Sequence, residues 1–154
     1  MKINIISVGK VKEKYLIAGI EEYKKRIGRF SNIEIITLPD EPNLDDEKKV
    51  RKIEAERILN RINENSYTIL LDLKGKSLTS EELSEKMVEI MNYHNSTINF
   101  VIGGSLGVDE EVKSKADFVL SFSKLTFPHQ LMKLILLEQI YRSFKINHNE
   151  TYHK

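Results

Sequence analysis

Residues 120–142, LSFSKLTFPHQLMKLILLEQIYR, decide how this chain folds. The stretch leaves an apolar strand, passes through a polar turn at residues 121–126, and enters a long helix at Phe127-Pro128-His129. Proline suits the first helical position, because its missing N–H would have had no partner within the helix. The backbone of the turn and the free N–H groups of the helix are therefore presented together at the carboxyl edge of a strand, where open α/β sheets bind ligands. The stretch predicts a binding site built largely from backbone.

Short apolar runs alternate with stretches of helical periodicity along the rest of the chain. The predicted strands are residues 2–8, 33–38, 67–73, 98–102 and 118–122, and the predicted helices are residues 11–27, 46–63, 79–93 and 109–115, followed by the long helix from residue 128. The run at 67–73 is apolar without interruption, as expected of a parallel strand that is covered on both faces. This alternation predicts one three-layer α/β/α domain, residues 1–154, with a mainly parallel sheet.

The composition is that of an ordinary globular protein, with 40% hydrophobic and 31% charged residues among 154. The lack of cysteine excludes disulfides, thiolate metal sites and cysteine nucleophiles. No apolar run approaches the roughly 20 residues that span a bilayer, and the N-terminal residues predict a strand rather than a signal peptide. We therefore expect a cytoplasmic protein that does not associate with membranes.

The charge is unevenly distributed, although the formal net charge is only +1. Residues 10–29 carry seven Lys or Arg against three Glu, and residues 142–154 carry three cations and two histidines against one Glu. Such clusters are found on solvated helix faces as well as on surfaces that bind polyanions, so charge alone leaves both interpretations open.

A glycine-rich turn, Gly103-Gly104-Ser105-Leu106-Gly107, follows the fourth predicted strand. It does not match the GxGxxG dinucleotide fingerprint, and Gly75-Lys76-Ser77 lacks the earlier glycine of a P-loop, since Leu70 stands there. A tight turn needs no function by itself. Because residues 121–128 form a second loop at a nearby strand end, however, the two loops together predict a pocket for a small polar cofactor.

The long helix is apolar on more than one face, which a helix lying on one side of a sheet does not require. Deep burial within one chain would explain this pattern, and we favour the alternative of a two-fold dimer interface. None of the four histidines has a carboxylate or a second imidazole four residues further on, so we expect no zinc site. The tail NHNETYHK, residues 147–154, is either frayed or supplies Tyr, His and Lys to an RNA target.

Three segments closely resemble the ribosomal RNA large subunit methyltransferase H family: FVIGGSLG at 100–107, LSFSKLTFPHQLMKLILLEQIYRSFKI at 120–146, and the terminal YHK. The segment ISVGKVKEKYLIAGIEEYKKRI at 6–27 matches as well, so the resemblance covers essentially the whole chain. Members belong to the SPOUT class and methylate N3 of a pseudouridine in 23S rRNA of the large ribosomal subunit. The resemblance implies a SPOUT fold whose C-terminal part forms a deep trefoil knot, with S-adenosylmethionine bound at the knot.

Carried over by position, the resemblance assigns two sets of residues. The cofactor contacts are Leu71, Gly103, Phe122, Ser123, Lys124, Leu125, Thr126 and Phe127, and the residues that contact the nucleotide are Arg142, Tyr152 and His153. The family further implies an obligate homodimer in which one protomer supplies the cofactor and the other supplies its tail. The base must lose its N3 proton as the methyl group arrives, which a neutral histidine or a positioned water could accept while an arginine stabilises the neighbouring carbonyls.

Two other functions are compatible with these residues. A SPOUT methyltransferase could act on another RNA such as tRNA, with the basic residues 10–29 as its RNA-binding face. A nucleotide-binding regulatory module without catalysis is the second alternative, and the Tyr152-His153 tail argues against it.

The sulfonium cofactor carries its own leaving group, so the reaction is expected to need no metal.

Overall fold

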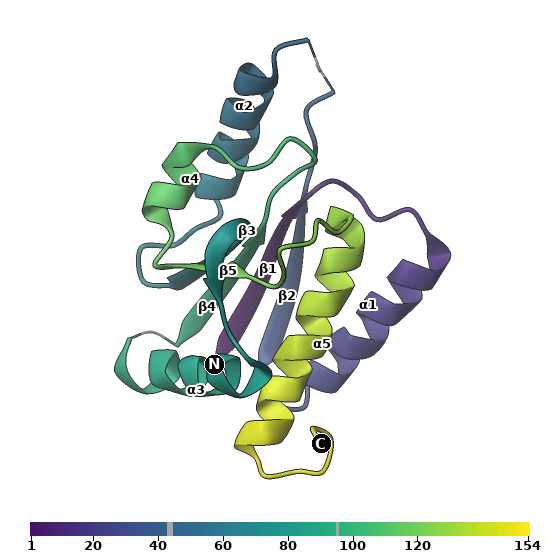
Figure 1. Cartoon of the computed structure of the whole chain (residues 1–154), viewed down its shortest axis with the longest axis vertical. Coiled ribbons are helices and arrows are strands. Elements are labelled where there is room, and N and C mark those ends of the chain that lie inside the picture. The colour runs from purple at the N-terminus through teal and green to yellow at the C-terminus, as the bar shows by residue number, and fades with distance from the viewer. Residues whose placement is uncertain (43–44, 95) are drawn as a thin grey trace.

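The computed structural model describes residues 1–42, 45–94 and 96–154 (Figure 1). The strands are β1 (Lys2–Val8), β2 (Asn32–Leu38), β3 (Tyr67–Ser77), β4 (Thr97–Ile102) and β5 (Phe118–Ser121). The helices are α1 (Lys14–Ile27), α2 (Glu47–Leu59), α3 (Ser80–Tyr93), α4 (Glu110–Lys115) and α5 (His129–Asn147). Every predicted strand and helix is therefore present, with boundaries that shift by a few residues.

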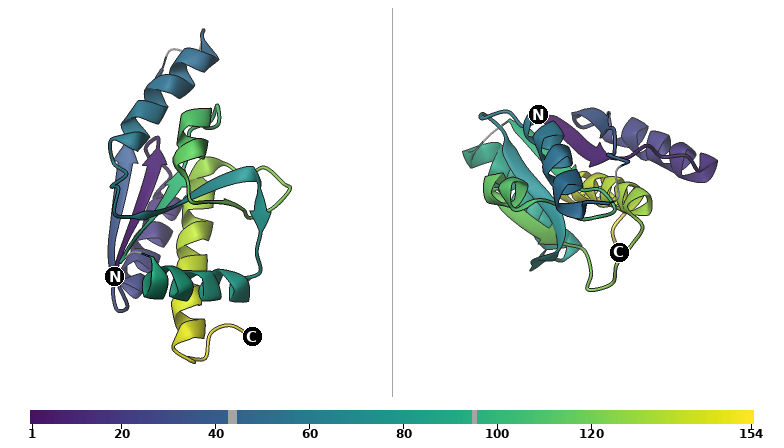
Figure 2. Two further views of the ribbon diagram at one scale, coloured as in Figure 1. Left: turned by 90° about the vertical axis from the view of Figure 1, so that its left-hand side faces the viewer. Right: turned by 90° about the horizontal axis from the view of Figure 1, so that it is seen from above.

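The five strands form one parallel sheet in the order β2-β1-β4-β3-β5. Helices α1, α3 and α5 cover one face of it, while α2 and α4 cover the other (Figures 1 and 2). The three-layer α/β/α prediction is confirmed. Because all strands run the same way, their carboxyl ends meet at one edge of the sheet, where the predicted loops also lie.

Strand β1 shows how the sequence builds two cores. Ile3 and Ile5 are fully buried on the face covered by α5, whereas Ile6 and Val8 are buried on the face covered by α2. Helix α5 packs between α1 and α3, and its sheet-facing stripe includes Leu136. Helix α5 therefore lies at the centre of this layer, where it contacts both α1 and α3.

Strand β3 departs most from the prediction, which ended it at Leu73. It continues to Ser77, and its pairing with β5 shifts register so that both Leu71 and Lys76 lie opposite Leu120. Gly75, within the shift, passes directly against the backbone of β5. Polar residues follow Leu73 in the sequence, so the apolar run alone could not predict this second pairing.

The start of α5 corrects one further detail. Pro128 has φ −55° and ψ 133° and caps the helix instead of occupying its first helical position, which belongs to His129. The carbonyl of Pro128 accepts the first intrahelical hydrogen bond, from the N–H of Met132 at 3.0 Å. Proline is still suited to this place, because a cap position needs no N–H donor. The trefoil knot implied by the resemblance stays a prediction.

Replacing Gly75 by alanine is expected to destabilise the fold by about 3 kcal/mol, the upper range for overpacking. A Cβ atom there would lie 2.7 Å from the carbonyl carbon of Leu120 and 2.7 Å from the carbonyl oxygen of Val119, and backbone cannot move as a side chain can. Urea unfolding measures the loss. Gly19→Ala is the control, since its Cβ would meet only the flexible side chain of Leu134. Equal stability of the two variants would contradict this packing.

Candidate active site

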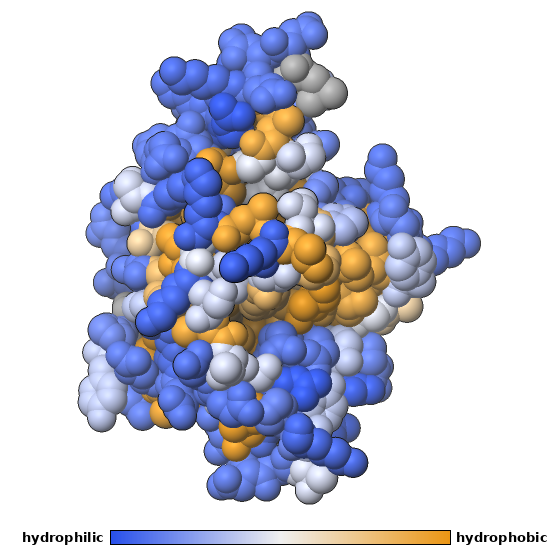
Figure 3. Space-filling view, in the orientation of Figure 1, coloured by the Kyte–Doolittle hydropathy of each residue, from blue (hydrophilic) through white to orange (hydrophobic). Residues whose placement is uncertain are grey.

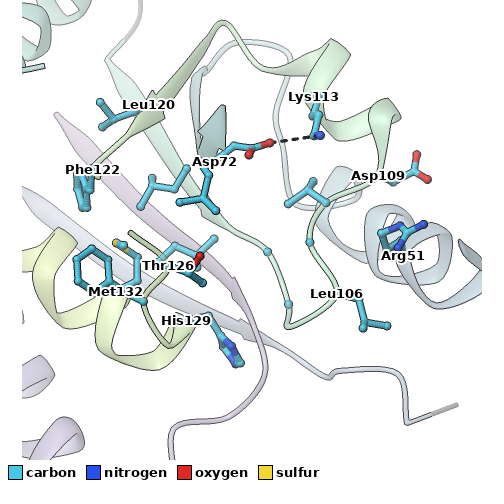
Figure 4. Close-up of a pocket in the computed structure, with 18 of the residues that line it drawn as sticks. Arg51, Asp72, Leu106, Asp109, Lys113, Leu120, Phe122, Thr126, His129 and Met132 are labelled. Carbon is cyan, nitrogen blue, oxygen red and sulfur yellow. Dashed lines mark ion pairs between the residues drawn. The ribbon is translucent and has the colours of Figure 1, made fainter. Parts of the chain in front are cut away.

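A cavity of about 570 Å³ opens at the carboxyl edge of the sheet (Figure 4). Its walls are the end of β3, the glycine turn after β4, and the turn that joins β5 to α5. Of the eight predicted cofactor contacts, seven line it: Leu71, Gly103, Phe122, Ser123, Leu125, Thr126 and Phe127. The eighth, Lys124, is not among the lining residues. The structure thus brings together loops that lie up to 56 positions apart in the chain, from Leu71 to Phe127.

The turn after β5 is closed by its own serines. Ser121 Oγ donates to the carbonyl oxygen of Ser123 at 3.1 Å, and Ser123 Oγ accepts from the N–H of Leu125 at 2.9 Å. Serine and asparagine side chains stabilise turns in this way by replacing backbone partners. Leu125 is 69% exposed at the tip. The polar sequence of the turn therefore fixes a backbone wall for the cavity.

Gly103 and Gly104 in the glycine turn are packed so closely that a Cβ at either position would clash. A Cβ at Gly103 would lie 2.3 Å from Cγ2 of Val108, and one at Gly104 would lie 2.8 Å from Oε1 of Glu54. Gly107 has φ +87°, a left-handed conformation that favours glycine, and its N–H donates to the carbonyl of Gly104 at 3.1 Å. The glycines of the turn therefore present backbone to the cavity, beside Leu106 and Val108, which also line it.

Glu54 lies against the glycine turn without lining the cavity, and the sequence interpretation missed this contact. Its side chain on α2 is only 5% exposed, touches the position of Gly104, and accepts the backbone N–H of Glu41 at 3.1 Å. The carboxylate thus joins the glycine turn to the segment after β2. Burial is the main cause that raises the pKa of Glu54 above its ordinary value.

The raised pKa of Glu54 predicts a pH dependence of stability. A carboxyl group with a higher pKa in the folded state stabilises the fold fully below its unfolded pKa, and loses that contribution as the pH rises through the folded pKa. Relative to Glu54→Gln, the wild type should therefore lose free energy of unfolding between acidic and neutral pH. Urea titrations from pH 4 to 7 measure this. Glu56→Gln, an exposed glutamate of the same helix, is the control, and parallel curves for wild type and Glu54→Gln would refute the prediction.

Charged residues form the outer rim of the cavity. Lys113 on α4 pairs with Asp72 on β3 at 3.3 Å, which ties the register shift of β3 to the neighbouring helix (Figure 4). Arg51 and Lys48 reach the same rim from α2. Among the described residues, no group of three His, Asp or Glu side chains could hold a metal ion. In the same ranges no helix is long and apolar enough to cross a membrane.

Arg142, Tyr152 and His153 come together along the C-terminal half of α5, around Glu138. Arg142 Nη2 lies 2.6 Å from Glu138 Oε1, and the Tyr152 hydroxyl donates to the same oxygen at 3.1 Å. Arg142 Nη1 lies 3.0 Å from His153 Nδ1, and His153 Nε2 lies 2.6 Å from Glu81 Oε1. The tail is therefore docked rather than frayed. Glu138 and Glu81 are the two anchors that the sequence interpretation did not identify.

The hydrogen bonds determine the protonation states of this cluster. Arginine can only donate, so His153 Nδ1 accepts from Arg142 and Nε2 carries the proton that is donated to Glu81. Burial is the main cause that raises the pKa of Tyr152 far above its usual range, and the hydrogen bond with Glu138 raises that of Arg142. The cluster thus combines a permanent cation, a neutral phenol and an imidazole whose basic nitrogen faces the cation.

Within one chain, this cluster and the cavity lie at opposite ends of α5 (Figure 1). From Met132, which lines the cavity, to Arg142 the helix advances by roughly 15 Å at about 1.5 Å per residue. The structure therefore assembles each predicted set separately and does not join them in a single protomer.

An apolar surface covers the upper part of α5 and the adjoining start of α1 (Figure 3). Leu131, Met132, Leu134 and Ile135 are only partly buried, so burial within one chain is incomplete on this side of α5, although Leu134 packs against the core. Tyr15 and Ile17 of α1 are 72% and 42% exposed nearby. Exposed apolar area of this kind is typical of a surface that meets another protein.

A fully parallel α/β sheet with a cavity at its carboxyl edge is the architecture of an α/β protein that binds a small molecule there. Residues 1–153 match the family model described as "Predicted SPOUT methyltransferase", and the chain belongs to this family. It therefore uses a methyl donor. A crystal structure assigned as a candidate RNA methyltransferase from Bacillus anthracis shares the fold, with a TM-score of 0.55 and 12% identity over 92% of this chain and 93% of that one.

Relatives named ribosomal RNA large subunit methyltransferase H align over the full length of both chains. The protein from Alkaliphilus oremlandii is 55% identical over 159 residues, covering 100% of each chain. Those from Ruminiclostridium cellulolyticum and Acetivibrio thermocellus are 52% and 50% identical, again with 100% coverage of both. The resemblance recognised in the sequence is confirmed.

Proposed function

We propose that this protein transfers a methyl group from S-adenosylmethionine to N3 of a pseudouridine in 23S rRNA of the large ribosomal subunit. The observation that carries the substrate is full-length identity of 50–55% to relatives named as methyltransferases of large subunit ribosomal RNA. The docked Arg142-Tyr152-His153 cluster supports a catalytic role over a purely regulatory one. Action on ribosomes would place the protein in the cytoplasm.

The cavity fits S-adenosylmethionine. Its volume of about 570 Å³ lies in the range of small-molecule sites, and its lining combines apolar side chains such as Leu120 with bare backbone. A Cβ at Gly103 or Gly104 would clash with Val108 or Glu54 and displace this wall of the cavity. Leu71, Gly103 and the residues of the turn, Phe122, Ser123, Lys124, Leu125, Thr126 and Phe127, are the groups proposed to hold it. When bound, the sulfonium supplies an electrophilic methyl group with its own leaving group.

The protein's contribution to the reaction is to position the base and manage one proton. The N3–H lies between two carbonyls, so negative charge develops on those oxygens as the proton leaves. The guanidinium of Arg142, which the cluster keeps cationic, can donate to one of them. His153 Nδ1 can accept the proton once Arg142 turns from it to the base. Alignment of the reacting atoms accounts for the rest of the rate enhancement.

We further propose a homodimer with a composite site. The cavity and the tail cluster lie about 15 Å apart along α5 within one chain, and a partly exposed apolar side of α5 lies between them. A two-fold dimer through that side would place the tail of one protomer beside the cavity of its partner. Light scattering at micromolar concentration should give twice the monomer mass of 17.9 kDa. A monomer mass would rule out the composite site.

The activity itself is tested with large ribosomal subunits that lack the modification. Incubation with the protein and S-adenosylmethionine should produce methylpseudouridine, detected by mass spectrometry of the nucleosides from 23S rRNA. Bulk tRNA is the parallel substrate. Methylation of tRNA alone would move the protein to another RNA target, and methylation of neither would refute the proposal.

A further inference from the structure

The C-terminal end of α1 packs beside the tail of the chain (Figure 1). Three tyrosine rings join them: Tyr23 lies 6.0 Å from Tyr141 between ring centres, and Tyr141 lies 4.9 Å from Tyr152 in an edge-to-face contact. Arg142 lies over the Tyr152 ring at 4.8 Å. The end of α1 is therefore continuous with the cluster proposed to contact the target nucleotide.

Arg26 is held in this row of rings with its guanidinium toward solvent. The guanidinium carbon lies 5.2 Å from the centre of the Tyr23 ring and 5.6 Å from that of Tyr141, and Nε donates to Glu22 at 2.9 Å. The side chain is still 40% exposed. Within the described residues, its two Nη groups make no hydrogen bond. A planar cation fixed in this way is suited to bidentate recognition of phosphate.

Further cations surround Arg26. Lys24, Lys25 and Arg26 occupy the last turn of α1, and Arg29 follows it; Lys25 and Arg29 are exposed. The helix dipole favours cations at a C-terminus and accounts for some of this charge. It does not account for a guanidinium placed against two tyrosine rings that lead to the tail.

The structure also divides the basic stretch 10–29. Lys10, Lys12 and Lys14 lie before or at the start of α1, and Lys14 is roughly 15 Å along the helix from its last turn at about 1.5 Å per residue. The sequence hypothesis treated the stretch as one RNA-binding face. In one protomer, only its C-terminal end is continuous with the tail.

We propose that the end of α1 and the tail form one RNA-binding surface, in which Lys25, Arg26 and Arg29 contact phosphates of the strand that flanks the target nucleotide. This inference rests on the proposed function, because it takes the tail to hold that nucleotide. Proteins read unpaired RNA with cations on the backbone and aromatic groups beside the bases, which is the combination found here. In this surface the oriented guanidinium of Arg26 recognises a phosphate, and Lys25 and Arg29 add positive charge that attracts the RNA backbone.

The first test is the salt dependence of binding to large ribosomal subunits. For Lys25→Gln/Arg29→Gln, the slope of log affinity against log salt should fall by about 1.4, because each phosphate contact on a single strand contributes about 0.7. Arg26→Lys keeps the charge and loses the planar fork, so it should raise KM for subunits with little change in slope. Lys52→Gln/Arg61→Gln removes the same charge from α2 and the turn after it, on the opposite face of the sheet, and should leave both values unchanged.

The second test identifies the partner by cross-linking. The chain has no cysteine, so Arg29→Cys carries a unique attachment point for a photoreactive group. Cross-links to 23S rRNA support the surface, and cross-links confined to a ribosomal protein overturn it. A wild-type slope and KM in Lys25→Gln/Arg29→Gln would overturn it as well. Absence of methyl transfer by the wild-type protein would instead refute the proposed function. Failure of the RNA-binding surface and failure of the proposed function are therefore distinguishable.

Discussion

Deleting residues 151–154 is expected to lower kcat for methyl transfer to large subunits by about 10³-fold, the middle of the range for loss of general acid–base groups. The deletion removes Tyr152 and His153, which together anchor the cluster around Arg142 through Glu138 and Glu81. Affinity for S-adenosylmethionine should stay within about twofold, because none of these residues lines the cavity. Single-turnover kinetics and calorimetry measure the two quantities.

Single substitutions separate the parts of that effect. His153→Ala and Tyr152→Ala should each lower turnover sharply, whereas Tyr152→Phe removes only the hydroxyl that donates to Glu138 and keeps the ring over which Arg142 lies. Tyr152→Phe should therefore fall between the wild type and Tyr152→Ala. Thr151→Ala is the matched control, since Thr151 is exposed and precedes the cluster. Full activity of the deletion on purified ribosomes would eliminate the tail from the reaction.

The cavity could be predicted from the sequence because each of its main walls is formed by one short segment of the chain. The turn at 121–127 is closed by serine hydrogen bonds that span two residues, and the glycines of the turn after β4 stand together in the chain. Periodicity placed both turns after strands of a parallel sheet, and parallel strands share a carboxyl edge. Their meeting followed from topology without any knowledge of side-chain contacts.

The residues that hold the site in place could not be predicted from the sequence in this way. Glu54 lies on α2 and contacts the position of Gly104, 50 positions further along the chain. Glu81 lies on α3 and contacts His153, 72 positions further along. In the sequence, each is one glutamate among many on an amphipathic helix, and only the packing of α2 or α3 distinguishes it. The predicted end of β3 at Leu73 was too early for a related reason. The polar residues at the end of this strand pair with β5, and no apolar pattern in the sequence indicates that pairing.

Mixing two inactive variants should restore about a quarter of the wild-type activity if the site is composite. One variant lacks residues 151–154, and the other, Gly103→Ala, places a Cβ where Val108 Cγ2 would lie 2.3 Å away and distorts the wall of the cavity. After random exchange about half of the dimers are mixed, and each mixed dimer holds one intact cavity facing one intact tail. If each cavity used the tail of its own chain, no mixed dimer would have a complete site.

The controls make this outcome decisive. Thr126→Trp fills the cavity with an indole and serves as a second cofactor-defective partner, in case Gly103→Ala folds poorly. Mixing Gly103→Ala with Thr126→Trp should restore nothing, because neither supplies an intact cavity. Native mass spectrometry counts the mixed dimers in each sample. Abundant mixed dimers without activity would show that the cavity and the tail do not act across the interface, whereas recovered activity would explain why each protomer carries its two sets of residues at opposite ends of α5.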